Sequence, residues 1–139
     1  MSDTTMLSPQ DALCAIMIAV SASDETIRTS ELVKISNIIH HLPVFAEFDP
    51  DRVATLSRTV FDIFDDEEGL DALFGLVKAA LPERLYETAY ALACDVAAAD
   101  GDIAQSELRL LEEMRYELNI DRLHAAAIER GSRARHMTL

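Results

Sequence analysis

The chain has 139 residues, half of them apolar, and its 25 acidic and 12 basic residues give it a net charge of −13. A chain of this size can bury one hydrophobic core, so we predict a single domain. The negative charge repels nucleic-acid phosphates and favours cations or basic proteins as partners. The apolar run at residues 12–20 is too short to cross a bilayer, and no basic segment precedes it. We therefore expect a cytoplasmic protein that neither inserts into a membrane nor binds nucleic acid.

Apolar residues recur with the period of an α-helix along almost the whole chain, and no stretch alternates as a β-strand does. The sequence therefore predicts an all-α fold with about seven helices. We expect one compact helical domain over residues 1–131, with Gly131 ending the last helix, and a frayed tail over residues 132–139. From the cap residues, prolines and glycines, the expected helices are 9–23, 29–41, 50–64, 66–81, 82–99, 105–119 and 122–131.

The chain contains an internal duplication. At an offset of 76 residues, segment 15–44 aligns with segment 91–120, and nine of the thirty aligned positions are identical. The shared core reads D-x-x-I-x-x-S-E-L and begins at Asp24 in the first copy and at Asp100 in the second. Each copy is followed by an Asp-Arg pair that opens a further helix. We expect segments 12–44 and 88–120 to superpose about a pseudo-two-fold axis, because two units are too few for a solenoid.

The loop of the second copy resembles one half of a calcium-binding EF-hand. With Gly101 at the sixth loop position, Asp100 and Glu107 fall at positions 5 and 12, where an EF-hand has ligands. Positions 1 and 3 supply two essential ligands, but here they are Val96 and Ala98. The ligand pattern therefore argues against a true EF-hand.

The motif glutamates are more informative than the loop. Glu31 and Glu107 each stand at the head of an apolar stripe on the helix that follows. A carboxylate on the core-facing side needs a partner, because burying it unpaired is costly. One partner is the backbone, since a glutamate in the first turn can accept hydrogen bonds from free N–H groups and is favoured by the helix dipole. The other is a cation or the basic side chain of a partner protein, and the sequence leaves both interpretations open.

The motif aspartates have the same two interpretations. Asp24 or Asp100 could accept a hydrogen bond from the backbone two residues further on, as turn aspartates do. If the pseudo-two-fold axis brings the two loops together, the acids of both copies share one surface. Two carboxylates about 4 Å apart repel by roughly 4 kcal/mol at an effective dielectric of about 20, so such a cluster requires a cation. The candidate metal ligands are Asp24, Glu31, Asp100, Asp102 and Glu107.

The stretch AAADGDIAQSELRLLEEMRYELNID, residues 97–121, resembles the signature of the TerB family of bacterial tellurite-resistance proteins. The resemblance is best over residues 82–124 and extends to the first copy. It implies an all-helical domain with an internal duplication, a cytoplasmic setting, a role in tellurite and general stress responses, and divalent-metal binding. By motif matching, the implied metal ligands are Asp100 and Glu107, with Asp24 and Glu31 from the first copy. The first copy departs from the family pattern, because Glu25 stands where the second copy has glycine.

The remaining chemistry-bearing residues favour structural roles. Cys14 and Cys94 lie in apolar helical runs, which is typical of reduced, buried thiols. His40 and His41 lack the spacing of a zinc site. No nucleophile elbow, phosphate-binding loop or dinucleotide fingerprint occurs, so we expect no catalytic residues and no enzymatic activity. The acidic run at residues 47–71 and the three arginines of segment 130–135 are expected to be solvated.

Two functions are compatible with these residues. The first is a TerB-like, non-enzymatic stress-response protein that binds a divalent cation, of unidentified metal, through its acidic interhelical loops. The second is a structural protein-interaction module in which the same acids cap helices. In that case the acidic face docks a basic or membrane-associated partner, such as a stress-response component.

Overall fold

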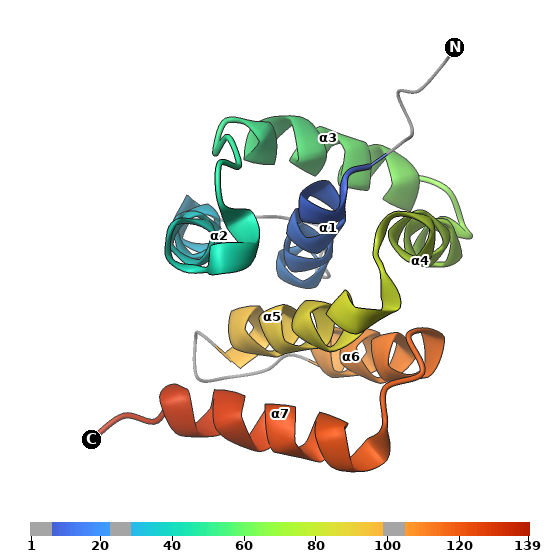
Figure 1. Ribbon diagram of the computed structural model, residues 1–139. Coiled ribbons are helices and arrows are strands. Elements are labelled where there is room, and N and C mark those ends of the chain that lie inside the picture. Colours follow the sequence, from blue (N-terminus) through green and yellow to red (C-terminus); the bar gives the residue numbers. More distant parts are fainter. Residues whose placement is uncertain (1–6, 23–28, 99–104) are drawn as a thin grey trace.

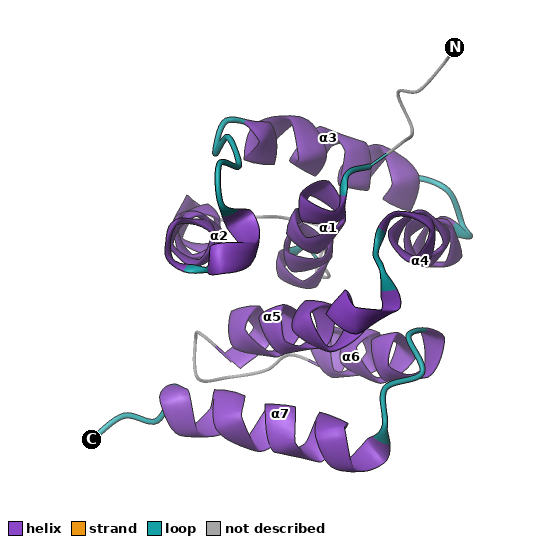
Figure 2. Cartoon of the chain, in the orientation of Figure 1, coloured by secondary structure: helices purple, strands orange, loops and turns teal. Residues whose placement is uncertain are grey.

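The computed structural model describes residues 7–22, 29–98 and 105–139. Every regular element in these ranges is helical, and none of the described residues forms a strand (Figure 2). The predicted all-α fold is therefore confirmed. No described helix is both long enough and apolar enough to cross a bilayer. The elements are α1 (Pro9–Ser21), α2 (Thr29–His41), η2 (Pro43–Phe45), α3 (Arg52–Phe64), α4 (Gly69–Ala80), η3 (Glu83–Leu85), α5 (Tyr86–Ala98), α6 (Gln105–Glu117) and α7 (Arg122–Arg135).

Helix α1 lies at the centre of the molecule (Figure 1). Every residue from Asp11 to Ser21 is buried, so this helix is covered on all sides. It packs mainly on α3, α4 and α5, and also touches α2 and α6. A helix that is apolar all round is stable only when other elements surround it. The core of the protein is therefore built around α1.

The N-terminus of α1 is fixed by a capping box. The Ser8 hydroxyl accepts a hydrogen bond from the Asp11 amide at 3.0 Å, and the Ser8 amide donates to the Asp11 carboxylate at 3.2 Å. Pro9 occupies the first turn, where its missing N–H costs nothing. Arg52, the first residue of α3, donates from Nε and Nη2 to the two oxygens of Asp11 at 2.8 and 2.7 Å. One carboxylate therefore caps α1 and joins it to α3.

The second half of the chain has its own central helix, α5, which packs on α1, α6 and α7 (Figure 1). Helices α2 and α6 are both 13 residues long. The first residue of α6 lies 76 positions after the first residue of α2, and the last residues are separated by the same number. The aligned residues Ile35 and Leu111 are both buried. The superposition of segments 12–44 and 88–120 remains a prediction.

The two Asp-Arg pairs begin α3 and α7 in different ways. Asp121 caps α7, because its carboxylate accepts hydrogen bonds from the amides of Leu123 at 2.9 Å and His124 at 3.1 Å. Asp51 precedes α3, but its side chain makes no capping hydrogen bond. The Asp-Arg pair therefore begins the two helices with different capping interactions.

The C-terminal end of the domain differs from our expectation. Helix α7 does not end at Gly131 but continues to Arg135, so residues 132–135 are not a frayed tail. Ser132 is 2% exposed, and Arg135 forms an ion pair with Asp95 of α5 at 2.7 Å. The burial of Ser132 and the ion pair of Arg135 with α5 hold the extra turn in place. A glycine ends a helix only where the backbone turns left-handed, and Gly131 has no such conformation.

Helix α5 also begins later than expected. Pro82 does not open it but precedes the short 3₁₀ turn η3, and the α-helix starts at Tyr86. Helix α6 was expected to end at Asn119 and ends at Glu117. Asn119 follows with a φ of 51°, and the Ile120 amide donates to the Arg115 carbonyl at 3.0 Å. That left-handed residue is a common way to terminate a helix.

Candidate functional site

The predicted metal ligands fall into two groups. Asp24, Asp100 and Asp102 lie outside the described residues, so the structure tests neither their positions nor their contacts. Glu31 and Glu107 are described. Among the residues that the structure covers, no three His, Cys, Asp or Glu side chains form a group able to hold a metal.

Glu31 and Glu107 occupy equivalent places. Each lies in the first turn of its helix, α2 or α6, and each side chain is half-buried. Each is also engaged in at least one polar or electrostatic interaction. On α6, the stripe headed by Glu107 continues into the core through Leu111, Met114 and Leu118. The carboxylates therefore stand where the apolar stripe meets the start of the helix, a position that the helix dipole favours for an anion.

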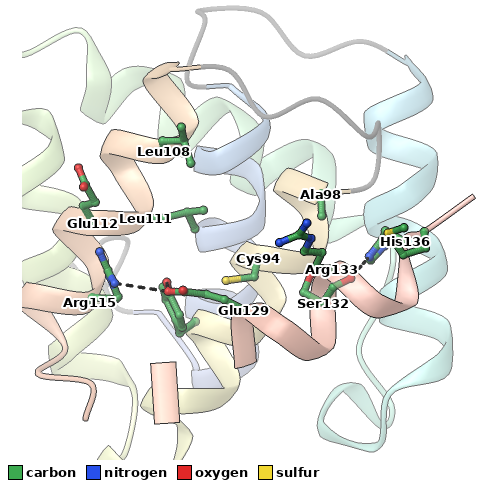
Figure 3. Close-up of a pocket in the computed structure, with 12 residues that line it drawn as sticks. Cys94, Ala98, Leu108, Leu111, Glu112, Arg115, Glu129, Ser132, Arg133 and His136 are labelled. Atoms are coloured by element: carbon green, nitrogen blue, oxygen red, sulfur yellow. Dashed lines mark hydrogen bonds and ion pairs between the residues drawn. The ribbon is translucent and has the colours of Figure 1, made fainter. Parts of the chain in front are cut away.

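A cavity of about 580 Å³ lies between α5, α6 and α7 (Figure 3). This α5–α7 cavity has a largely apolar lining, and its size is in the range of small-molecule sites. Leu108 and Met137, which contribute to the lining, are 42% and 69% exposed. The lining residues are Tyr90, Cys94, Ala98, Leu108, Leu111, Glu112, Arg115, Glu129, Ser132, Arg133, His136 and Met137.

Three polar side chains in the lining of this cavity interact with one another. The hydroxyl of buried Tyr90 donates a hydrogen bond to the Glu129 carboxylate. Figure 3 shows Arg115 directed toward the same carboxylate, and its Nη1 lies 3.5 Å from a carboxylate oxygen. Burial raises the pKa of Tyr90, and its hydrogen bond to Glu129 raises that pKa further. Tyr90 is therefore a neutral hydrogen-bond donor at physiological pH. The interactions of Tyr90, Glu129 and Arg115 link α5, α7 and α6.

The potential nucleophiles of the cavity are not activated. Burial raises the pKa of the Cys94 thiol to about 12, so the thiol is neutral at pH 7. Ser132 donates no side-chain hydrogen bond to any described residue, and its carbonyl accepts one from the His136 ring at 2.8 Å (Figure 3). The described part of the cavity thus pairs neither group with a general base.

Sequence reasoning did not identify this cavity. Its polar residues come from three helices and share no spacing that a motif could reveal. The three arginines of segment 130–135 are exposed, as expected, but Arg133 also lines the cavity and Arg135 also pairs with Asp95. The paired Tyr90 could have been noticed as a tyrosine in an otherwise apolar run, since a buried tyrosine hydroxyl usually has a partner.

The fold and the motif together define an acidic, all-helical domain with a repeated D-x-x-I-x-x-S-E-L sequence. The sequence matches the family described as tellurite resistance protein TerB over residues 10–130. The chain therefore belongs to the TerB family and is a tellurite-resistance-associated domain, as its motif predicted. No curated protein and no solved structure matches it.

Proposed function

We propose that this TerB-family chain is a non-enzymatic, cytoplasmic stress-response protein that binds a divalent cation through its repeated acidic motif. The observation that carries the proposal is the placement of Glu31 and Glu107. Each half-buried carboxylate lies in the first turn of a helix of 13 residues. The two helices begin 76 residues apart and end 76 residues apart. Each glutamate follows a motif aspartate by seven residues in the sequence. Carboxylates are the oxygen ligands that hard divalent cations prefer.

Within the described residues, two potential nucleophiles of the α5–α7 cavity are not activated. Cys94 is held as a neutral thiol, and the Ser132 hydroxyl has no base as a partner among those residues. The net charge of −13 supports the cation-binding part, because an acidic protein concentrates cations near its surface.

Thermal unfolding tests the proposal. Wild-type protein is melted with chelator and then with calcium, magnesium, manganese or zinc, at matched ionic strength. We expect one of these ions to stabilise the fold by about 2.7 kcal/mol at a hundredfold excess over its dissociation constant. Glu107→Gln and Asp100→Asn are expected to abolish most of that gain. Glu31→Gln and Asp24→Asn should remove less of it, because the second copy has an additional acid, Asp102, and a glycine in its loop.

Glu112→Gln is the matched control, since Glu112 is an exposed glutamate on the same helix as Glu107. It removes the same charge and should leave the metal response intact. Isothermal calorimetry gives the stoichiometry directly. Melting curves that coincide with chelator and with every ion would eliminate the metal-binding function.

A second function is favoured by a different observation. The segment 47–71 carries nine acids and two arginines. One of those arginines, Arg52, is committed to Asp11, which lies outside the segment. The segment therefore presents more unneutralised acid than its sequence indicates. We propose as the alternative an interaction module in which the motif glutamates cap helices and this acidic face docks a basic or membrane-associated partner.

The two proposals differ in their response to Glu107→Gln. In the interaction module, the amide oxygen still accepts the capping hydrogen bond, so the variant loses only a few tenths to about 1 kcal/mol of stability. That loss should then be the same with and without divalent ions. Partner binding by the acidic face should weaken as salt increases, because salt screens exposed charges.

A further inference from the structure

A second cavity, of about 600 Å³, lies beside the turn that joins α3 to α4. Its apolar lining includes Phe61, Phe64 and Leu70, and residues of α1 and α6 complete it. Asp65, Asp66 and Glu67 form its acidic rim. We call this cavity with its rim the α3–α4 groove. It is distinct from the α5–α7 cavity, with which it shares no lining residue.

The acidic rim is held on a rigid turn. The Asp65 amide donates to the Phe61 carbonyl at 3.1 Å, and the Gly69 amide donates to the Asp66 carbonyl at 3.0 Å. Gly69 packs so closely that an added Cβ would lie 2.3 Å from the Ile63 carbonyl oxygen. The backbone of the turn is thus fixed before anything binds, which lowers the entropic cost of binding.

The rim carboxylates are exposed and unneutralised. Asp65, Asp66 and Glu67 are adjacent in the chain and all exposed. No ion pair joins any of them to another described residue, since the basic partners in the described ion pairs contact Asp11, Glu87, Asp95, Glu117 and Glu129. Neighbouring negative charges repel one another, so a cationic group placed among these three carboxylates is favoured.

The chemistry of the groove selects between possible occupants. A lone metal ion would use the carboxylates but not the apolar lining, and the cavity is far larger than one ion. An apolar small molecule would fill the lining but leave the charge uncompensated. An amphipathic helix satisfies both, because its large apolar side chains enter the groove while flanking Lys or Arg residues reach the rim.

We propose that the α3–α4 groove is the docking site for a basic amphipathic helical segment of a partner protein, with apolar side chains against Phe61, Phe64 and Leu70 and cationic side chains on Asp65, Asp66 and Glu67. This inference deepens the interaction-module proposal and rests on it. It adds the location of the site and the chemistry of the partner segment.

Fluorescence anisotropy with a synthetic peptide tests the site. The probe is a labelled helix of about four turns with Leu and Phe at i, i+3, i+4 and i+7 and Lys elsewhere. We expect it to bind the full chain in chelator at low salt and to bind more weakly as salt increases. A scrambled peptide of the same composition should bind much less. Replacing all three rim acids, Asp65→Asn, Asp66→Asn and Glu67→Gln, should weaken binding by about tenfold.

A matched triple removes the same charge elsewhere. Glu83, Glu112 and Glu113 are exposed acids outside both the groove and segment 47–71, and changing each to Gln should weaken binding by less than about threefold. A second pair of variants tests the apolar lining. Leu70→Lys should reduce binding at least as strongly as the rim triple, whereas Leu70→Met should leave it near the wild-type value. Melting curves of all variants report whether the fold is retained.

The possible failures are distinguishable. Equal weakening by the two triples would overturn the groove as the site but leave an acidic docking surface, and hence the interaction module, standing. Failure of the peptide to bind the wild type would overturn both. A divalent-ion stabilisation that the rim triple abolishes would identify a metal site in place of the peptide site. The first two outcomes do not affect the proposed metal site at the motif glutamates, because its test uses other variants. The third would place the ion at the rim and count against the motif glutamates as its ligands.

Discussion

Asp11 shows how one residue connects local structure to tertiary structure. Its burial acts to raise the carboxyl pKa, but the hydrogen bonds from Arg52 and Ser8 outweigh this and hold the pKa below its ordinary value. A group with a lowered pKa stabilises the fold fully above its unfolded pKa, near 4, and that stabilisation is lost as the pH falls through the folded pKa. The Asp11–Arg52 pair therefore contributes at neutral pH and not in strong acid.

Arg52→Met should destabilise the protein by about 2 kcal/mol at pH 7, because it leaves the Asp11 carboxylate buried without its cation. We place the value below that of a fully buried pair, since the Arg52 side chain is 46% exposed. Urea unfolding measures the difference. The deficit should narrow below about pH 4, where protonation removes the unpaired charge. Arg58→Met on the same helix is the control, and an equal loss there would show that charge alone, rather than the pair, is responsible.

The two cysteines should not react with thiol-directed reagents in the native protein. Cys14 and Cys94 are both free and buried, and burial raises the pKa of each thiol to about 12. Since the thiolate is the reactive form, a thiol-directed reagent should label neither residue until the chain is denatured, after which it should label both. Labelling is followed by absorbance and mass spectrometry. Rapid modification of the folded protein at either position would contradict this expectation.

At the scale of the elements, two glycines of α4 should respond to alanine in opposite ways. Gly69→Ala should destabilise by roughly 1–3 kcal/mol, because the new Cβ would lie 2.3 Å from the Ile63 carbonyl oxygen, a backbone atom. Gly75→Ala should stabilise by about 0.5–1 kcal/mol, because nothing lies within 4 Å of its added Cβ and alanine favours the helix. Urea denaturation of both variants gives the comparison. A destabilised Gly75→Ala would indicate that the exposed face of α4 is packed against something.

The two Asp-Arg pairs provide a second matched comparison. Asp121→Ala should lower the melting temperature at pH 7, because it removes the acceptor for the Leu123 and His124 amides. Asp51→Ala should lower it less, because that side chain makes no capping hydrogen bond. The difference between the two variants should shrink in acid, since the pKa of Asp121 is lowered mainly by the His124 amide. Equal shifts in the two melting temperatures would show that capping does not distinguish them.

The sequence predicted those helices whose limits are set by local chemistry. Helix α2 begins and ends where the apolar period and flanking residues indicated, and Ser8 and Pro9 begin α1 as expected. The end of α7 could not be predicted this way, because the ion pair of Arg135 with Asp95 joins residues 40 apart. The α5–α7 cavity was missed for the same reason, since its walls come from three helices. Of the candidate metal site, the sequence placed Glu31 and Glu107 correctly in first turns.

At the scale of the whole molecule, charge opposes the fold. A net charge of −13 on a chain of 139 residues generates self-repulsion in the compact state. The melting temperature at pH 7 should therefore rise with sodium chloride up to physiological ionic strength and above, as screening weakens the repulsion. Sucrose at equal osmolality is the control for non-ionic effects. Stability that falls with added salt would mean that favourable ion pairs such as Asp11–Arg52 outweigh the repulsion.

The burial of α1 has a consequence for biosynthesis. The ribosome releases this helix, Pro9–Ser21, well before it makes α5, Tyr86–Ala98, against which α1 packs. At about 5–20 residues per second, the delay is on the order of ten seconds. During that time α1, which is buried on every face in the folded protein, is packed against only some of its partner helices. The nascent chain therefore exposes apolar surface of α1 during synthesis, and the domain can complete its core only once its second half has emerged.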